Sequence, residues 1–204
     1  MDSCPVVSSD LKDAVKAACP TLVLASQSPN RRRLLEDCGV RVLARPQDID
    51  EMCGLTEPAS VVQTLSRQKM GSYLRSSDFD PSLPAVAVDT LVCLDGKLLG
   101  KPSDEDDAAR MIALLSGRTH EVLSGLCVYN PATKTLSEVF DTSLVRFHGL
   151  SDEEIAWYVS TGDPMGAAGA YKIQSHGYRL IESISGSFSN IIGLPLEKLV
   201  EILG

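Results

Sequence analysis

The chain has 204 residues, with 27 Asp and Glu against 19 Lys and Arg, which gives a net charge of −8. Its composition, 44% hydrophobic and 23% charged, is typical of a globular protein of one domain that needs neither a disulfide nor a metal to fold. The net acidity excludes a general nucleic-acid binder, because phosphate contacts require a basic face. The longest stretch without a charged residue, 183–196, is shorter than the about 20 apolar residues of a membrane span, so we expect no membrane partner.

The cysteines and the N-terminus indicate a cytoplasmic protein. Asp2 stands where a secretory signal carries Lys or Arg. The six cysteines and three histidines are scattered, without zinc or redox spacing. Free thiols are typical of a reducing compartment.

Two units are expected along the chain. Residues 1–20 are interpreted as an N-terminal extension, with a weak helical pattern after Ser9 that ends at Pro20. Residues 21–204 are interpreted as a single domain with two lobes around a cleft.

The first part of this domain shows clear element boundaries. The apolar run 21–25 predicts a strand, after which Ser28 and Pro29 supply an N-cap and a proline for the first helical position. A second helix is expected to begin at Pro58. Its apolar residues recur every three or four positions, and Lys69 lies on that apolar stripe.

The middle of the chain predicts strands and a tight turn. Two apolar runs, 85–88 and 91–94, flank the pair Asp89-Thr90, and Asp95-Gly96 is typical of a two-residue hairpin. Beyond them, Ser103 and Asp106 form an expected capping box at the start of a helix.

The second half adds β-runs and two further helices. The runs 120–129 and 135–147 predict an antiparallel hairpin, 178–184 predicts another strand, and helices are expected after Ser151 and from Pro195. Helices thus alternate with both parallel-type connections and hairpins, which predicts an α/β protein with a mixed sheet.

Three consecutive arginines lie at the start of the helix that follows Ser28. Cations are disfavoured in a first helical turn by a few tenths to about 1 kcal/mol each, and Arg31 occupies the position where a capping box has Glu. An anion bound at the helix N-terminus would reverse this penalty. The alternative is a solvated face, on which Glu36 and Asp37 pair with the arginines.

Three other polar residues can also be interpreted either as part of a functional site or as ordinary structural or surface residues. Asp89 directly follows an apolar strand, where open α/β sheets bind ligands, although an isolated aspartate there is often a turn residue. Pro102 confines Lys101 to extended geometry, but it can equally be a surface lysine. Lys69 can contribute to a site or extend its ammonium to water.

An acidic cluster and several missing motifs narrow the chemistry. Asp48, Asp50 and Glu51 suit a hard divalent ion, although acidic loops are often just solvated. The sequence contains no P-loop, no dinucleotide-binding glycine motif, no nucleophile elbow and no evident covalent nucleophile.

Several segments, in order, resemble the motifs of the Maf family of nucleotide pyrophosphatases. They are LASQSPNRRRLL (24–35), DIDE (48–51), Gln68-Lys69, AVDTLVCLDGKLLGKP (87–102), LSGRTHEVLSGL (115–126), AGAYKIQ (168–174) and GSFSNIIGLP (186–195). The resemblance implies an elongated, twisted mixed sheet flanked by helices with a central cleft, similar to inosine triphosphate pyrophosphatases. It also implies hydrolysis of nucleoside triphosphates to the monophosphate and pyrophosphate with a divalent cation, Mg²⁺ or Mn²⁺, and it is compatible with a homodimer.

The resemblance further implies roles for individual residues. Asp89 matches the general base, Glu51 and Asp89 the metal ligands, and Lys101 and Glu51 further catalytic residues. The positions that match substrate-binding residues are Ser26, Ser28, Arg31 and Lys69.

Three positions match the residues that determine base specificity: Asn30, Thr90 and Gln174. Thr90 and Gln174 favour dTTP and UTP over 7-methyl-GTP, which is the alternative substrate. A non-enzymatic nucleotide-binding regulator of cell division is a second alternative.

The sequence also departs from the family pattern near these positions. Asn30 replaces an arginine, Gly166-Ala167 replaces an Asp-Lys pair, and Lys172 replaces a glycine.

Overall fold

The computed structural model describes residues 6–49 and 53–204. Its seven-stranded sheet has the order β2-β1-β3-β5-β6-β7, and β4 pairs with β3. The strands are β1 (Thr21–Leu24), β2 (Arg41–Ala44), β3 (Ala85–Leu94), β4 (Lys97–Leu99), β5 (Thr119–Asn130), β6 (Thr135–Phe147) and β7 (Ile181–Ser185). Strand β1 runs parallel to β2 and β3, whereas the other pairs are antiparallel. The predicted α/β class with a mixed sheet is therefore confirmed.

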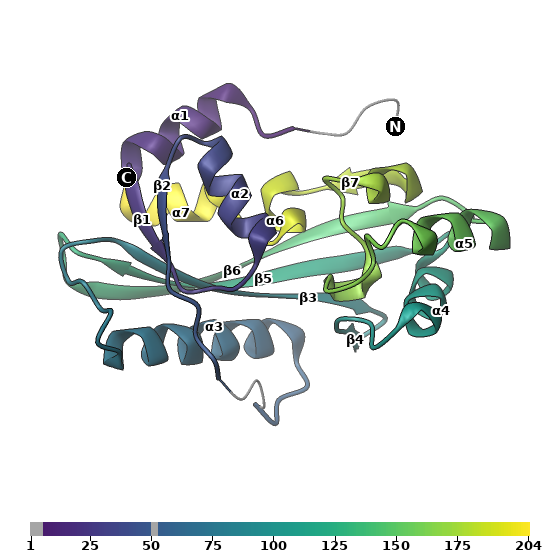
Figure 1. The fold of residues 1–204 in the computed structure, drawn as a ribbon, viewed down its shortest axis with the longest axis horizontal. Coiled ribbons are helices and arrows are strands. Elements are labelled where there is room, and N and C mark those ends of the chain that lie inside the picture. The colour runs from purple at the N-terminus through teal and green to yellow at the C-terminus, as the bar shows by residue number, and fades with distance from the viewer. Residues whose placement is uncertain (1–5, 50–52) are drawn as a thin grey trace.

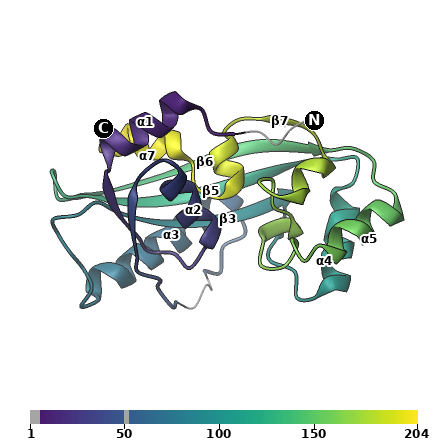
Figure 2. The same cartoon turned by 45° about the horizontal axis from the view of Figure 1, so that its top comes forward.

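Helices cover both faces of this sheet (Figure 1). They are α1 (Ser9–Ala18), α2 (Pro29–Asp37), α3 (Pro58–Arg75), α4 (Glu105–Leu115), α5 (Asp152–Ser160), α6 (Phe188–Ile192) and α7 (Leu196–Leu203), with 3₁₀ turns η1 (Ala168–Ala170) and η2 (His176–Leu180). Helix α3 lies alone along one face of the central strands, and α1, α2, α6 and α7 lie over the other; α4 and α5 pack together at the far end of the elongated sheet (Figures 1 and 2). None of the described helices is long and apolar enough to cross a bilayer.

The alternation of side chains along β3 connects the two faces. Val86 and Val88 pack in a core cluster with residues of α1, α2 and α7, whereas Ala85 and Ala87 pack in another with residues of α3. Successive side chains of a strand point to opposite faces, so Asp89 continues the α3 face and Thr90 the α2 face.

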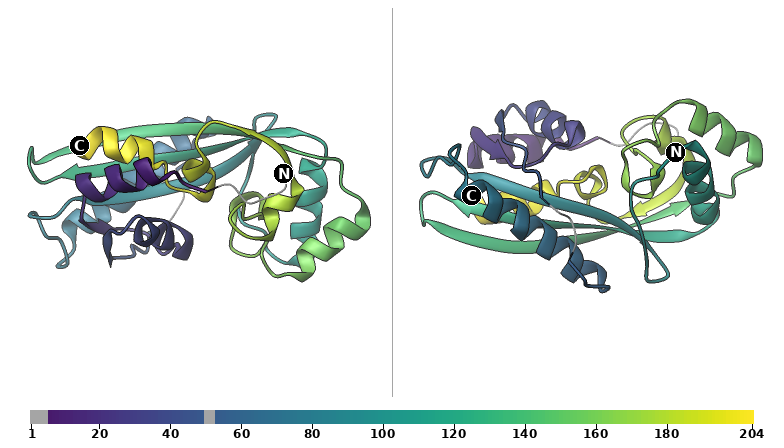
Figure 3. Two further views of the ribbon diagram at one scale, coloured as in Figure 1. Left: turned by 90° about the horizontal axis from the view of Figure 1, so that it is seen from above. Right: turned by 60° about the horizontal axis from the view of Figure 1, so that its bottom comes forward.

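The described part of the N-terminal extension packs against the sheet domain. Helix α1 contacts α7 (Figure 3), and Val15 and Cys19 are fully buried in the core cluster that contains residues of β1 and α7. The expected helix after Ser9 is confirmed, while the division of the chain at residue 20 stays a prediction.

Several predicted local signals are confirmed. Asp95 and Gly96 both have positive φ, 50° and 76°, as the predicted two-residue hairpin between β3 and β4 requires. Helix α5 begins after Ser151 as expected, and the structure shows a complete capping box there between Ser151 and Glu154.

Two local predictions are wrong. The N-cap of α4 is Asp104 rather than Ser103, because the carboxylate of Asp104 accepts the Asp107 N–H while Asp107 in turn accepts the Ser103 N–H. The predicted strand 178–184 begins only at Ile181. Its partner β6 ends at Phe147, which pairs with Ile181, so the preceding residues have no ladder to join and form η2.

A buried histidine makes the folded state sensitive to acid. His120 is 2% exposed, its Nε2 lies 2.9 Å from the Tyr171 hydroxyl, and burial lowers its pKa from 6.5 to about 4. The native state therefore keeps this imidazole neutral, while the unfolded chain takes up a proton below pH 6.5. Its stabilisation is present above pH 6.5 and is lost as the pH falls towards 4, by up to about 3 kcal/mol.

Urea unfolding of the wild type and of His120→Phe at several pH values between 7.5 and 4.5 measures this effect. We expect the free energy of unfolding of the wild type to fall more steeply below pH 6.5 than that of His120→Phe. Parallel pH profiles would contradict a neutral buried His120.

Candidate active site

The sheet has a break in strand pairing along one edge of β3. Strand β1 pairs with Ala85 and Val86, and β4 pairs with the stretch from Val92 to Leu94. On this edge no described strand pairs with Asp89 or Thr90, although β5 pairs with both on the other edge. Breaks where the strand order diverges are the usual ligand sites of open α/β sheets.

Asp89 forms a buried ion pair on the α3 face. Its Oδ1 accepts a hydrogen bond of 2.6 Å from the Lys69 ammonium, and the two residues are only 7% and 9% exposed. Lys69 therefore does not extend to water, which was the alternative from the sequence. A buried charge pair requires close geometry to offset its desolvation, so the position of α3 matters.

Gly125 allows α3 to lie close enough for this contact. It pairs directly opposite Asp89 on β5, and a β-carbon at this position would come within 2.4 Å of the backbone carbonyl atoms of Val62 on α3. Only glycine permits such an approach of helix backbone to strand. Sequence reasoning missed this residue, although a glycine within an apolar β-run is a signal of close backbone approach.

Arg31 forms the corresponding network on the opposite face, around Thr90. Its guanidinium donates to Thr90 Oγ1 (2.8 Å), Ser26 Oγ (2.9 Å) and the carbonyl oxygens of Val88 (3.0 Å) and Gly193 (2.7 Å). Arg31 thus joins α2, β3 and the turn after α6, and it occupies part of the break in strand pairing.

The start of α2 is built as its sequence predicts. Ser28 is the N-cap, its hydroxyl accepts the Arg31 N–H, and Pro29 is the first helical residue. Ser26 is largely buried beside this turn, and its hydroxyl accepts the Ser28 N–H.

The three arginines of α2 have three different environments. Arg32 pairs with Glu36 at 2.8 Å on the surface, as the solvated alternative predicted. Arg31 turns inward to protein oxygens, which neither alternative anticipated. Arg33 lines a pocket.

The second carboxylate oxygen of Asp89 is suited to a cation. Oδ2 is buried and accepts no hydrogen bond from any described residue. A carboxylate oxygen with free lone pairs, beside a break in the sheet, fits Mg²⁺ or Mn²⁺, which are commonly held by one or two carboxylates together with substrate phosphates.

The other expected metal ligand, Glu51, lies outside the described residues, as does Asp50. Within residues 6–49 and 53–204, no group of three or more potential ligands gathers around one point. Asp89 is therefore a described residue that could hold a metal at this site through Oδ2.

Lys101 lies beside the same edge of β3. Val92 pairs with Leu99, so the chain beyond β4 runs back along β3 towards Thr90. The carbonyl of Gly100 accepts the Gly169 N–H at 2.9 Å, which fixes this segment against η1. Lys101 itself is exposed, and the structure shows no ion pair between it and Asp89.

A pocket of about 420 Å³ lies between α2 and the segment that precedes η2. It brings together two of the three predicted specificity residues, Asn30 and Gln174. The other lining residues are Arg33, Leu34, Asp37, Asp163, Lys172, Ser175 and Ile192. Thr90, the third specificity residue, does not line this pocket but is bonded to Arg31, the neighbour of Asn30.

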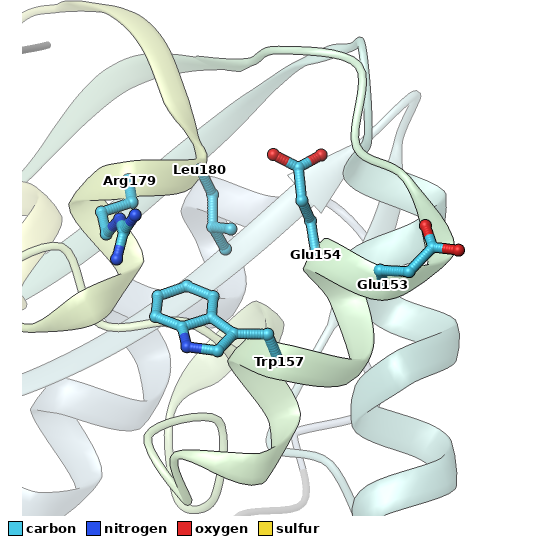
Figure 4. A pocket seen from close by; sticks show the side chains of 5 residues that line it. All are labelled: Glu153, Glu154, Trp157, Arg179 and Leu180. Carbon is cyan, nitrogen blue, oxygen red and sulfur yellow. The ribbon is translucent and has the colours of Figure 1, made fainter.

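A second pocket, of about 350 Å³, lies on α5 and η2 (Figure 4). The Arg179 guanidinium stands 4.6 Å from the centre of the Trp157 ring, and Glu153, Glu154 and Leu180 complete the lining. None of the candidate residues lines this second pocket. We therefore place the site at the break in strand pairing along the edge of β3, between β1 and β4.

Comparison with known proteins identifies the family. The family model described as Maf-like protein matches residues 21–204. The chain belongs to the Maf family. The resemblance noted in its motifs is thereby confirmed, and it extends over the whole sheet and both candidate-site faces.

Similar Maf proteins carry a consistent name. A protein of Anaeromyxobacter dehalogenans named dTTP/UTP pyrophosphatase is 44% identical over 188 residues, covering 90% of this chain and 93% of that protein. Proteins with the same name from Symbiobacterium thermophilum and Aquifex aeolicus are 39% and 37% identical, each over 89% of this chain and over 92% and 93% of their own lengths.

Proposed function

We propose that this Maf protein hydrolyses dTTP and UTP to the nucleoside monophosphate and pyrophosphate with the help of a divalent cation. The observation that carries the proposal is the buried Lys69–Asp89 pair at the break in strand pairing along β3. In this pair, Oδ2 of Asp89 has no described partner. The name shared by the similar Maf proteins supports the choice of substrate.

Asp89 is the general base in this proposal. Water bonds to the α-phosphorus, Asp89 takes its proton, and the bond from the α-phosphorus to the bridging oxygen breaks, so that pyrophosphate leaves. Lys69 holds Oδ1 of Asp89, while Oδ2 has no described partner and is the oxygen that accepts the proton in this proposal. A carboxylate base requires no covalent intermediate, in keeping with the lack of an evident nucleophile.

Charge on the phosphates is neutralised by cations. Lys101, on the exposed segment beside β3, contacts the leaving pyrophosphate. Asp89, with Glu51 as the expected second ligand, would hold the divalent cation, which when bound would neutralise further phosphate charge.

The start of α2 completes the phosphate site. Ser26 and Ser28 supply hydroxyls there, while Arg31 adds positive charge and holds Thr90, because its hydrogen bonds already serve protein oxygens.

The rest of the proposal concerns the setting of the reaction. We place the protein in the cytoplasm, where nucleoside triphosphates occur and where the five described cysteines remain free thiols. The expected homodimer stays a prediction.

The first expected result is the identity of the product. UTP and dTTP should yield the monophosphate and pyrophosphate, so that orthophosphate appears only when inorganic pyrophosphatase is added. In ¹⁸O-labelled water the label should enter the monophosphate, because attack occurs at the α-phosphorus. The value of kcat/KM should also be higher for UTP and dTTP than for 7-methyl-GTP.

Three outcomes would contradict the proposal in different ways. Orthophosphate as the initial product, or label in the pyrophosphate, places the cleavage at another bond. Faster hydrolysis of 7-methyl-GTP favours the alternative substrate. Nucleotide binding without any hydrolysis, across Mg²⁺ and Mn²⁺, favours the regulator.

A further inference from the structure

Lys172 lines the pocket of Asn30 and Gln174 and stands where the resembling family has a glycine. Its backbone is fixed on both sides. The Lys172 N–H donates to the hydroxyl of the fully buried Tyr158 (3.1 Å), and its carbonyl accepts the Ser175 N–H (3.2 Å). Only the four-carbon side chain is left to adjust, so the ammonium is confined to the neighbourhood of this pocket.

The acidic neighbours leave this ammonium available. Asp163 accepts hydrogen bonds from the backbone N–H and the ring Nδ1 of His176, both at 3.0 Å. Burial raises the pKa of Asp163, but hydrogen bonds from Ser175 and His176 outweigh burial and hold this pKa below its usual value. Asp163 is therefore a carboxylate already engaged by His176. Within the described part of the chain, Lys172 forms no ion pair with it or with Asp37.

The remaining lining suits a flat polar ring. Asn30 and Gln174 each offer an amide donor and an acceptor, and Leu34 and Ile192 offer apolar surface. Uracil and thymine present two carbonyl oxygens on either side of one N–H. An amide can accept from that N–H, and an ammonium can donate to a carbonyl oxygen.

We propose that Lys172 determines base specificity by donating a hydrogen bond from its ammonium to a carbonyl oxygen of uracil or thymine bound between Asn30 and Gln174. This inference rests on the proposed function, because it places the base of the substrate in this pocket. The family pattern has an arginine at position 30, where this chain has Asn30. In this proposal Lys172 supplies the missing cation from another side of the same pocket.

The charges of the pocket favour a base over the triphosphate. Asp37 and Asp163 balance Arg33 and Lys172, so the lining as a whole is neutral and two carboxylates would repel phosphate groups. Adenine presents an amino donor instead of a carbonyl oxygen, and the positively charged ring of 7-methylguanine would repel the ammonium. Lys172 thus favours the keto pyrimidines by attraction to their carbonyl oxygens, gives adenine no such contact, and repels the charged ring of 7-methylguanine.

The test compares Lys172→Met and Lys172→Gly with a matched control, Lys198→Met. Lys198 lies on α7, where its ammonium pairs with Glu201 at 2.9 Å. The measurements are kcat/KM for UTP, CTP and ATP, together with calorimetric affinity for UMP and AMP. We expect kcat/KM for UTP and affinity for UMP to fall roughly 10-fold or more in both Lys172 variants, as loss of a charged hydrogen bond requires. ATP, AMP and the control variant should change by less than about twofold.

The pattern across nucleotides decides the outcome. A loss for UTP but not CTP supports a contact with O4, and equal losses for UTP and CTP, with ATP unchanged, support a contact with O2. Adding Asn30→Arg to Lys172→Met should restore part of the preference for UTP over ATP. Equal losses for UTP, CTP and ATP, with weaker inhibition by tripolyphosphate, would overturn the proposal, because Lys172 would then contact phosphate. Unchanged constants would also overturn it.

The binding measurements separate this inference from the proposed function. If the wild type hydrolyses no nucleotide, the proposed activity fails. The role of Lys172 is then tested by binding alone: its substitution should lower the affinity for UMP and leave the affinity for AMP unchanged.

Discussion

Asp89→Asn is expected to lower kcat by 10²–10⁴-fold, about 3–5 kcal/mol of barrier, in a protein that still folds. The amide has the shape of the carboxylate, but it cannot take a proton from water or bind a cation as a charge. Its oxygen can still accept the hydrogen bond from Lys69, which holds Asp89 at 2.6 Å in the wild type. The measurement is kcat for UTP at saturating Mg²⁺, together with the thermal midpoint.

Asp78→Asn provides the control for this substitution. Asp78 lies on the surface between α3 and β3, where it pairs loosely with Arg45 at 3.8 Å and takes no part in the contacts of Asp89. This variant should retain the wild-type kcat. A folded Asp89→Asn protein with near-wild-type kcat would remove Asp89 from the mechanism and leave Glu51 as the candidate base.

The two faces of the site differ in how well the sequence could predict them. Asp89 follows an apolar run, and Lys69 lies on an apolar helical stripe. Both are local sequence patterns, and they were sufficient to make these residues candidates. The inward turn of Arg31 could not be predicted in this way. It depends on the carbonyl of Gly193, 162 residues away, and on the break between β1 and β4, which are features of the assembled sheet.

The same distinction holds for the fold. Helix boundaries with a proline or a capping box, at Pro29, Pro58 and Ser151, were predicted correctly because the signal lies within a few residues. Strand β2 and helix α6 went unpredicted, since each is only four or five residues long and gains its stability from neighbours.

The limit of prediction from the sequence is clearest for the pocket that Asn30 and Gln174 line. Asn30 and Gln174 lie on segments separated by most of the chain, and no periodic pattern links them. Their shared pocket follows from the packing of the segment before η2 beside α2. The contribution of Lys172 to this lining was likewise outside the reach of sequence patterns.

Gly125→Ala is expected to destabilise the protein by about 3 kcal/mol, the upper end of the usual cost of overpacking, and to lower kcat/KM of the remaining folded enzyme. The new methyl group would meet the Val62 carbonyl carbon and oxygen at 2.4 Å and the Gln63 nitrogen at 2.7 Å. These are backbone atoms, which cannot rotate away as a flexible side chain would, so α3 has to move off the sheet. Lys69 is carried by the same helix, and a shift of α3 lengthens its contact with Asp89.

Gly149→Ala is the matched control, because no heavy atom lies within 4 Å of a β-carbon there and its φ is not positive. Urea unfolding measures the free energy, and kcat/KM per folded molecule is measured below the transition. If α3 only closes the core, Gly125→Ala should lose stability but keep its rate when folded. If α3 also positions Lys69, the folded variant should lose at least tenfold in kcat/KM, because small misplacements of catalytic groups reduce rates strongly. Wild-type stability in Gly125→Ala would contradict the close approach itself.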